Sequence, residues 1–230
     1  MTSTGVAALD QKIASLARDY EQRGYAVFRE PGNVGLPFDL GSYKPDIVAR
    51  KGDEGLIIEV KASTSRISID RFQALAETVR EHPGWRFLLV TLQDLPIPEG
   101  AEQFLSWIEL KTKLSQVRML VSDGMFDAAA LYAWAIFEAA MRKRAVATAT
   151  PVERLPATTL MSHLYTLGHM DVDAFAVAKE FLALRNPIAH GFGTVHDDEA
   201  IEKFLQIASR LLGEWSHTAD ANDSGDAATH

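Results

Sequence analysis

The sequence contains no cysteine among its 230 residues, which excludes disulfide bonds, thiolate metal sites and cysteine nucleophiles. It also has no uninterrupted apolar run of about 18 residues, so we expect no transmembrane helix and no contact with a membrane. The first residues do not show the basic and then apolar order of a signal peptide. These absences together lead us to expect a cytoplasmic protein.

Positive charge is also scarce, and the formal net charge is −8. A broad basic surface for nucleic acid is therefore disfavoured, and any such site must depend on particular residues. The sequence has no Walker or GxGxxG nucleotide-binding motif and no HExxH zinc motif. Hydrophobic residues make up 47% and charged residues 23%, which are ordinary values for a folded protein.

The first half of the sequence mixes helical and strand periodicity. The pattern predicts α-β-β-β-α-β order, with segments at 7–23, 25–29, 47–50, 56–61, 69–81 and 85–92. A stretch rich in proline and glycine at 96–100 then indicates a boundary. We therefore predict an α/β domain over residues 1–97.

The second half carries almost no strand signal. Helical periodicity predicts an all-α bundle over residues 101–215, with helices at 101–121, 126–146, 158–168, 172–186 and 198–215. The polar, acidic segment 216–230 is predicted to be a disordered tail. The expected fold class is thus α/β plus all-α.

A predicted hairpin brings three charged residues together. Gly52–Asp53 suits a two-residue type II′ turn, and opposed residues then have numbers that sum to 105. Asp46 therefore lies opposite Glu59, and Lys61 shares the face of Glu59 because side chains alternate along a strand. Two carboxylates and one amine are expected at the open end of the hairpin.

This arrangement suits metal-assisted hydrolysis of a phosphodiester. Opposed carboxylates repel by about 0.2–1 kcal/mol, and a Mg²⁺ ion, which prefers carboxylate, water and phosphate oxygens, removes that penalty. Lys61 can then orient or deprotonate water, or neutralise charge that develops on the phosphate. The alternative is a salt-bridged surface, but Glu59 interrupts the apolar run 56–60, where an unpaired charge without a function is rare.

Pro45-Asp46, twelve intervening residues and Glu59-Val60-Lys61 resemble the PD-(D/E)XK nuclease signature. The element order over 7–92 is similar to the core of that superfamily, which has a mixed central sheet. The fuller segment most resembles the restriction-endonuclease-like group related to archaeal Holliday-junction resolvases, the AHJR-like group. The resemblance implies that Asp46 and Glu59 bind Mg²⁺ or Mn²⁺ with help from the Val60 carbonyl, and that Lys61 is catalytic.

The same resemblance implies additional site residues on the two helices. Many such nucleases add an acidic residue from the first helix, for which Glu21 is the first candidate and Asp19 the second. Gln73, on the second helix, occupies a position where some families keep a polar site residue. The alternative is that these are ordinary exposed helical side chains.

A second motif lies in the helical half, where Pro187 is predicted to kink or break a helix between Arg185 and His190. If the break brings them together, His190 can act as acid or base near neutral pH and Arg185 can bind phosphate. The spacing resembles the R-x4-6-H motif of HEPN domains, with Asn186 inside it, and Glu138 lies in a segment similar to their packing helix. This resemblance implies a homodimer and either RNA cleavage or a purely structural role.

The prediction is therefore a Mg²⁺-dependent endonuclease, with DNA rather than RNA as the expected nucleic-acid partner and a role in defence against phage or foreign DNA. One alternative is a HEPN-type RNase or toxin-like module with a sensor or inactive nuclease-like domain. Another is a nucleic-acid-binding or interaction protein without catalysis.

Overall fold

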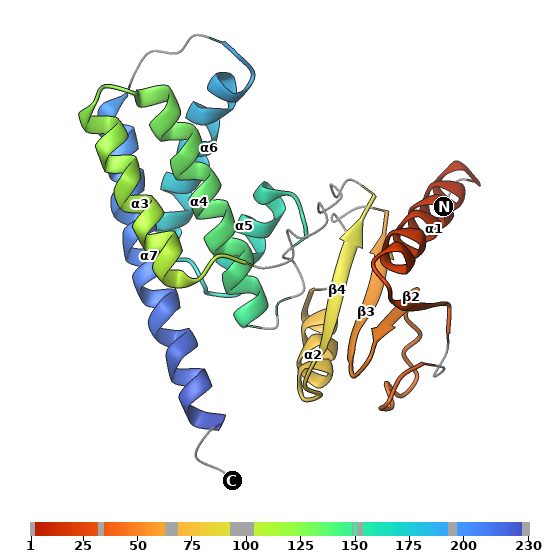
Figure 1. Cartoon of the computed structure of the whole chain (residues 1–230). Coiled ribbons are helices and arrows are strands. Elements are labelled where there is room, and N and C mark those ends of the chain that lie inside the picture. The colour runs from red at the N-terminus through yellow and green to blue at the C-terminus, as the bar shows by residue number, and fades with distance from the viewer. Residues whose placement is uncertain are drawn as a thin grey trace. The chain divides into compact units, whose positions relative to one another are not determined.

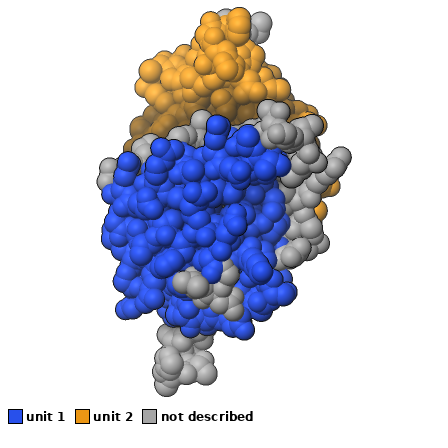
Figure 2. Space-filling model, turned by 90° about the vertical axis from the view of Figure 1, so that its right-hand side faces the viewer, with its two compact units in different colours: residues 1–102, 148–160 blue, residues 103–147, 161–230 orange. Residues whose placement is uncertain are grey.

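The computed structural model describes residues 3–31, 35–62, 69–92, 104–148, 150, 154–192 and 197–226. The chain forms two compact units, one of residues 1–102 and 148–160 and the other of residues 103–147 and 161–230 (Figure 2). The predicted boundary at 96–100 lies outside the described residues. Within the described ranges, no helix is long and apolar enough to cross a membrane.

The first unit contains a four-stranded mixed sheet (Figure 1). Strand β1 is antiparallel to β2, β2 is antiparallel to β3, and β3 is parallel to β4. The elements are α1 (Ser3–Gln22), β1 (Ala26–Arg29), β2 (Ile47–Lys51), β3 (Glu54–Lys61), α2 (Ile69–Arg80) and β4 (Trp85–Thr91). The predicted α-β-β-β-α-β order and the mixed sheet are confirmed.

The turn between β2 and β3 sets the register as predicted. Lys51 pairs with Glu54 across the two-residue loop, and Gly52 adopts a φ of 63° while Asp53 does not adopt a positive φ. A positive φ at the first loop residue alone is the type II′ geometry, which glycine adopts without steric cost. The pairing then runs to Ile47 opposite Ile58, with residue numbers that sum to 105 throughout.

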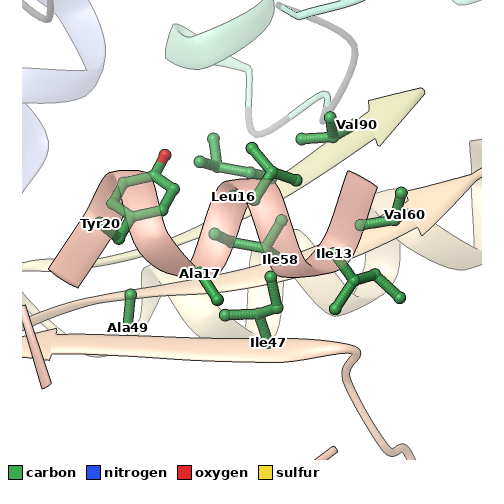
Figure 3. Close-up of a cluster of buried hydrophobic side chains, with 10 residues drawn as sticks. Ile13, Leu16, Ala17, Tyr20, Ile47, Ala49, Ile58, Val60 and Val90 are labelled. Atoms are coloured by element: carbon green, nitrogen blue, oxygen red, sulfur yellow. The ribbon is translucent and has the colours of Figure 1, made fainter. Parts of the chain in front are cut away.

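The two faces of the sheet have different roles. Helix α1 packs on one face, where the buried cluster consists of Ile13, Leu16, Ala17, Tyr20, Ile47, Ala49, Ile58, Val60, Leu88 and Val90 (Figure 3). The opposite face carries Phe87, whose ring stacks on Phe72 of α2 with centroids 5.8 Å apart. Because side chains alternate along β3, Glu59 and Lys61 share this second face with α2. The apolar core and the polar site are thus separated by the sheet.

The second unit is a helical bundle with an aromatic core. Its helices are α3 (Trp107–Ser122), α4 (Phe126–Ala147), α6 (Val172–Ala189) and α7 (Asp198–Asp226), and α5 (Ala157–Thr166) crosses the division between the units at Leu160. Phe181 of α6 stacks on Phe204 of α7 with centroids 3.8 Å apart, and Phe137 of α4 meets Phe204 edge-on at 5.2 Å. The predicted all-α character of this half is confirmed.

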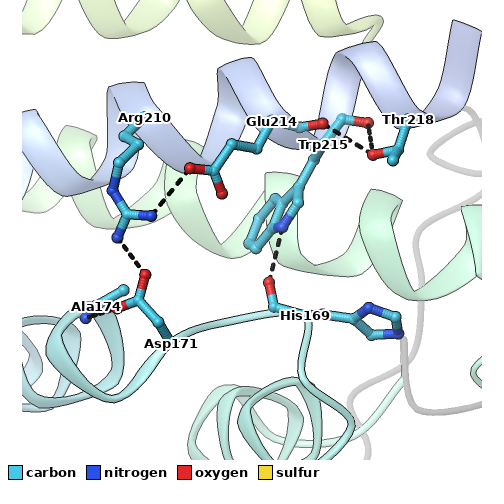
Figure 4. A network of polar contacts seen from close by, with 7 residues as sticks. All are labelled: His169, Asp171, Ala174, Arg210, Glu214, Trp215 and Thr218. Carbon is cyan, nitrogen blue, oxygen red and sulfur yellow. Dashed lines mark hydrogen bonds and ion pairs between the residues drawn. The ribbon is translucent and has the colours of Figure 1, made fainter.

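A polar network links the start of α6 to α7 (Figure 4). The Asp171 side chain caps α6 by accepting the Ala174 N–H at 2.8 Å, and it accepts Arg210 Nη2 at 2.5 Å. Beside it, the Trp215 indole N–H donates to the His169 carbonyl at 2.9 Å. The Ala174 N–H, with a smaller contribution from Arg210, lowers the pKa of Asp171 below its usual value.

Two local predictions differ in part from the structure, and residues 227–230 of the predicted tail lie outside the described residues. Helix α7 continues to Asp226, so residues 216–226 are helical and not a disordered tail; Ser216 is only 5% exposed and accepts Lys111 Nζ at 2.7 Å. Helix α6 continues through Pro187 to Ala189, so it does not break at that proline. Proline removes one backbone donor, but the turn that follows keeps its helical bonding, because the His190 N–H still donates to the Asn186 carbonyl at 3.2 Å.

Candidate functional site

Asp46 lies directly before β2 and is bonded to the strands on both sides of it. Its backbone carbonyl accepts the Glu30 N–H at 2.8 Å, at the end of β1. Its side-chain Oδ2 accepts the Val60 N–H of β3 at 2.7 Å. The carboxylate is therefore fixed against the C-terminal part of β3, where the register predicted it.

Glu59 lies on β3 and is 7% exposed. Both of its carboxylate oxygens accept hydrogen bonds from side chains: Lys61 Nζ donates to Oε1 in an ion pair, and the Tyr43 hydroxyl donates to Oε2 at 2.5 Å. Lys61 remains partly exposed, with 39% of its side chain accessible. The structure thus brings together Asp46, Glu59 and Lys61, as the sequence predicted, and adds Tyr43.

The main chain at Val60 faces Asp46. Within a strand, the N–H and C=O of one residue point to the same side, so the Val60 carbonyl points toward the same edge as its N–H. In the continued register, Pro45 lies opposite Val60, and proline has no N–H to donate to that carbonyl. The Val60 carbonyl therefore lacks a strand donor there, which suits the predicted role as a metal ligand.

The electrostatics of the site disfavour an ionised Asp46. Burial is the largest cause that raises the pKa of Asp46, and the nearby carboxylates of Glu59 and Glu30 raise it further. The Val60 N–H and Lys61 lower it by less, so the pKa lies above its ordinary value. A cation bound between Asp46 and Glu59 would remove this repulsion.

The donor set fits a small, hard cation. Two carboxylates and one carbonyl supply oxygen ligands, and Mg²⁺ commonly takes one or two carboxylates and completes its shell with water and phosphate oxygens. Among the described residues, no group of three or more histidine, aspartate or glutamate side chains is arranged to hold a metal ion. Any ion at this site would therefore depend on oxygen atoms from water or substrate.

A model of the AHJR-like family of restriction-endonuclease-like proteins (REase_AHJR-like) matches residues 1–121, more than half of the sequence. The chain belongs to this family. No curated protein matches the sequence. The matched region contains Asp46, Glu59 and Lys61, and the family suggests a nuclease. The match ends in α3, so it does not support the HEPN resemblance of the bundle.

In this AHJR-like protein, Glu21 lies away from the two carboxylates. Lys51 Nζ donates to the Arg23 carbonyl at 3.0 Å, so the C-terminal end of α1 lies near the turn of the hairpin. Asp46 and Glu59 lie at the other end of β2, about 16 Å away at 3.3 Å per residue. The exposed Glu21 is thus not brought to the site, and Asp19 pairs with Arg23 at 2.8 Å.

The opposite half of α1 lies closer to the site. In Figure 3, Tyr20 lies over Ala49 while Ile13 lies beside Val60. Asp10 is one helical turn before Ile13 and is exposed. It is therefore the acidic residue of α1 that lies nearest to the open end of the hairpin along the strands, although α1 covers the sheet face opposite to Glu59 and Lys61.

Gln73 also makes its contact elsewhere. Its amide donates to Glu77 Oε1 at 3.3 Å, one turn along the exposed side of α2. The neighbouring Phe72 faces the site instead, with Lys61 Nζ 5.8 Å from the centre of its ring. The described contacts therefore do not bring Gln73 to Asp46 or Glu59.

The sequence reasoning missed Tyr43 and Glu30. Tyr43 belongs to the long loop between β1 and β2, where residue spacing carries no periodic signal for the direction of a side chain. Glu30 adopts a φ of 46°, which is rare for a residue with a side chain, and it extends the row of acids across β1, β2 and β3. The signal that could have found Glu30 is the pairing register of β1 with β2, which places Glu30 next to Asp46.

The second predicted motif has different surroundings. The Arg185 guanidinium lies 5.3 Å from the centre of the Trp134 ring, whose N–H donates to Glu138 at 3.1 Å, and Glu138 pairs with Arg142 at 2.5 Å. His190 is exposed at the C-cap of α6. In the described part of the chain, no hydrogen bond joins Arg185 to His190. Asn186, exposed between them, contributes its backbone carbonyl to the end of the helix.

Proposed function

We propose that this AHJR-like protein is a Mg²⁺-dependent endonuclease that hydrolyses phosphodiester bonds in DNA, in defence against phage or foreign DNA. The observation that supports the proposal is the convergence of Asp46, Glu59 and Lys61 at the open end of the β2–β3 hairpin. A purely structural ion pair would need one carboxylate for Lys61, whereas here a second carboxylate lies opposite the first at a cost in repulsion.

Each site residue has a distinct role in this proposal. Asp46, Glu59 and the Val60 carbonyl would hold the ion, which supplies a polarised phosphate and an activated water when bound. Lys61 places its partly exposed ammonium beside Glu59. From there it orients the attacking water and neutralises negative charge that develops on the phosphate oxygens.

The acidic charge of the whole chain is compatible with a local site. Asp46 and Glu59 count toward the net charge of −8, but their charges would be balanced by the bound cation. Binding of DNA is therefore expected to require the metal and to involve few phosphates. The affinity should accordingly fall only weakly with salt, because each neutralised phosphate adds to the salt dependence.

The test is cleavage of duplex, branched and single-stranded DNA with Mg²⁺ or Mn²⁺ and with EDTA. Asp46→Asn and Lys61→Ala are expected to reduce the rate by about 100-fold or more, the usual loss for a group that acts on the reacting atoms. Asp53→Asn and Lys51→Ala, on the same hairpin at its turn, serve as matched controls and should retain activity. Equal activity in all four variants would contradict the proposal.

The alternatives give different results in the same experiments. A HEPN-type RNase would cleave RNA without metal, and His190→Ala would abolish that cleavage while Asp46→Asn would not. A binding or interaction protein would bind neither Mg²⁺ nor Mn²⁺ by calorimetry and would cleave nothing. The proposed homodimer through the helical unit is tested by light scattering of the full chain.

A further inference from the structure

Tyr43 is an uncharged side chain that bonds directly to a carboxylate of the site. Its hydroxyl donates to Glu59 Oε2 at 2.5 Å, while Lys61 donates to Oε1. Glu59 is almost fully buried, so it has little water to orient it. The direction of its carboxylate is therefore set by these two protein donors.

The loop before β2 is built to deliver Tyr43. Asp39 Oδ1 accepts the Gly41 N–H at 2.9 Å, and Gly41 has a φ of 63°, a conformation that favours glycine. The Tyr43 N–H then donates to the Leu40 carbonyl at 3.2 Å, and the Leu40 side chain is buried. The turn is thus closed by two hydrogen bonds, one of them from the Tyr43 backbone, and anchored by one apolar side chain.

Aromatic contacts hold the ring of Tyr43. It meets Phe87 of β4 edge-on, with centroids 6.2 Å apart and an interplanar angle of 68°. Phe87 stacks on Phe72, and Lys61 Nζ lies over the Phe72 ring. Both donors to Glu59 thus rest on one pair of stacked rings, so their positions are fixed relative to each other.

We propose that Tyr43 is a positioning residue for metal binding, and this inference rests on the proposed function. A carboxylate offers about four lone-pair sites, and the Tyr43 and Lys61 bonds occupy two of them. The remaining lone pairs stay available for an ion shared with Asp46. Hydrogen-bond partners of metal-binding carboxylates typically contribute about 10–100-fold to metal affinity or activity.

The hydroxyl and the ring of Tyr43 can be separated by substitution. Tyr43→Phe removes the donor to Glu59 and keeps the ring that contacts Phe87. The matched control is Tyr20→Phe, which removes a hydroxyl that accepts Arg154 Nη1 at 3.2 Å, on the other face of the same sheet. Both variants lose one hydrogen-bonded hydroxyl, but only Tyr43→Phe should alter the site.

The experiment is calorimetric titration of the full chain with Mg²⁺ and Mn²⁺ in the absence of nucleic acid. Tyr43→Phe is expected to weaken metal binding by about 10–100-fold, while Tyr20→Phe binds as the wild type does. In DNA cleavage, Tyr43→Phe should raise the metal concentration for half-maximal rate by a similar factor. At saturating metal, its kcat should stay within a few-fold of the wild-type value, because the hydroxyl orients Glu59 and does not touch the reacting atoms.

The possible outcomes separate the two proposals. Wild-type metal affinity in Tyr43→Phe would overturn the positioning role and leave the nuclease proposal intact. Failure of the wild type to bind either metal would overturn both. If Tyr43→Phe lowers the thermal midpoint, the same substitution is also made in a Glu59→Ala variant. The two decreases in thermal midpoint are then compared. An equal loss in both backgrounds would show that the hydroxyl does not act through Glu59, and would also overturn the inference.

Discussion

The relative stability of Asp46→Asn and the wild type should depend on metal. The variant should be at least as stable as the wild type without metal, and less stable when metal is added. In the metal-free protein, Asp46 is partly buried, opposes Glu59 and lies near Glu30, and these factors raise its pKa. Asparagine keeps a carbonyl oxygen that can accept the Val60 N–H, but it removes the negative charge. Relief of one opposed like-charge pair amounts to about 0.2–1 kcal/mol.

Without metal, Asp46→Asn is therefore expected to be as stable as the wild type or more stable. A gain of that size raises the thermal midpoint of a domain of about 100 residues by roughly 1–6 °C. With Mg²⁺ at about 100 times its Kd, binding stabilises the wild type by about 2.7 kcal/mol, and a variant that binds poorly does not gain this. The wild type then becomes the more stable of the two.

Differential scanning calorimetry in EDTA and in Mg²⁺ checks this reversal, because it resolves the two units if they unfold separately. Asp53→Asn, at the exposed turn of the same hairpin, is the control and should follow the wild type in both buffers. Two results would refute the reasoning. One is a loss of more than about 1 kcal/mol by Asp46→Asn in EDTA, which would make Asp46 a structural residue. The other is an equal stabilisation of both proteins by Mg²⁺.

Two further predictions concern the helices. Asp10→Asn should weaken metal-dependent DNA cleavage more than Glu21→Gln, because Asp10 lies nearer than Glu21 to the open end of the hairpin along the strands; equal rates for the two variants would contradict this prediction. Asp171→Ala should lower the free energy of unfolding by about 1 kcal/mol at neutral pH through loss of the cap on Ala174. Because the folded-state pKa of Asp171 is lowered, its contribution is present above its unfolded pKa of about 3.9 and is lost as the pH falls through the folded value. Urea denaturation at neutral and acidic pH measures this, and a gap between variant and wild type that widens in acid would contradict it.

The hairpin shows how much of the site could be predicted from local rules. A turn of two residues with glycine first allows one register, and that register places Asp46 opposite Glu59. The alternation of side chains then assigns Lys61 to the same face. Both steps use interactions between residues close in the sequence, which is why they agreed with the structure.

The choice of Glu21 shows where local rules stop. The periodicity of residues 7–23 predicted the helix and its buried face, but a period carries no information on how the helix lies along the sheet. The bond from Lys51 to the Arg23 carbonyl reports that direction, and it joins residues 28 positions apart. Pro187 is a similar case, because the local cost of a proline does not show whether the surrounding helix continues past it, as α6 does here.

Local sequence patterns were enough to predict the α/β and all-α halves, the hairpin register and the position of Asp46 opposite Glu59. These follow from hydrophobic periodicity and turn geometry, which act over a few residues. Packing between distant segments was needed to place the Tyr43 hydroxyl against Glu59 and the Arg185 guanidinium over Trp134. Both contacts depend on the path of a loop or the packing of two helices, and these are set by the burial of the whole core and not by any local pattern.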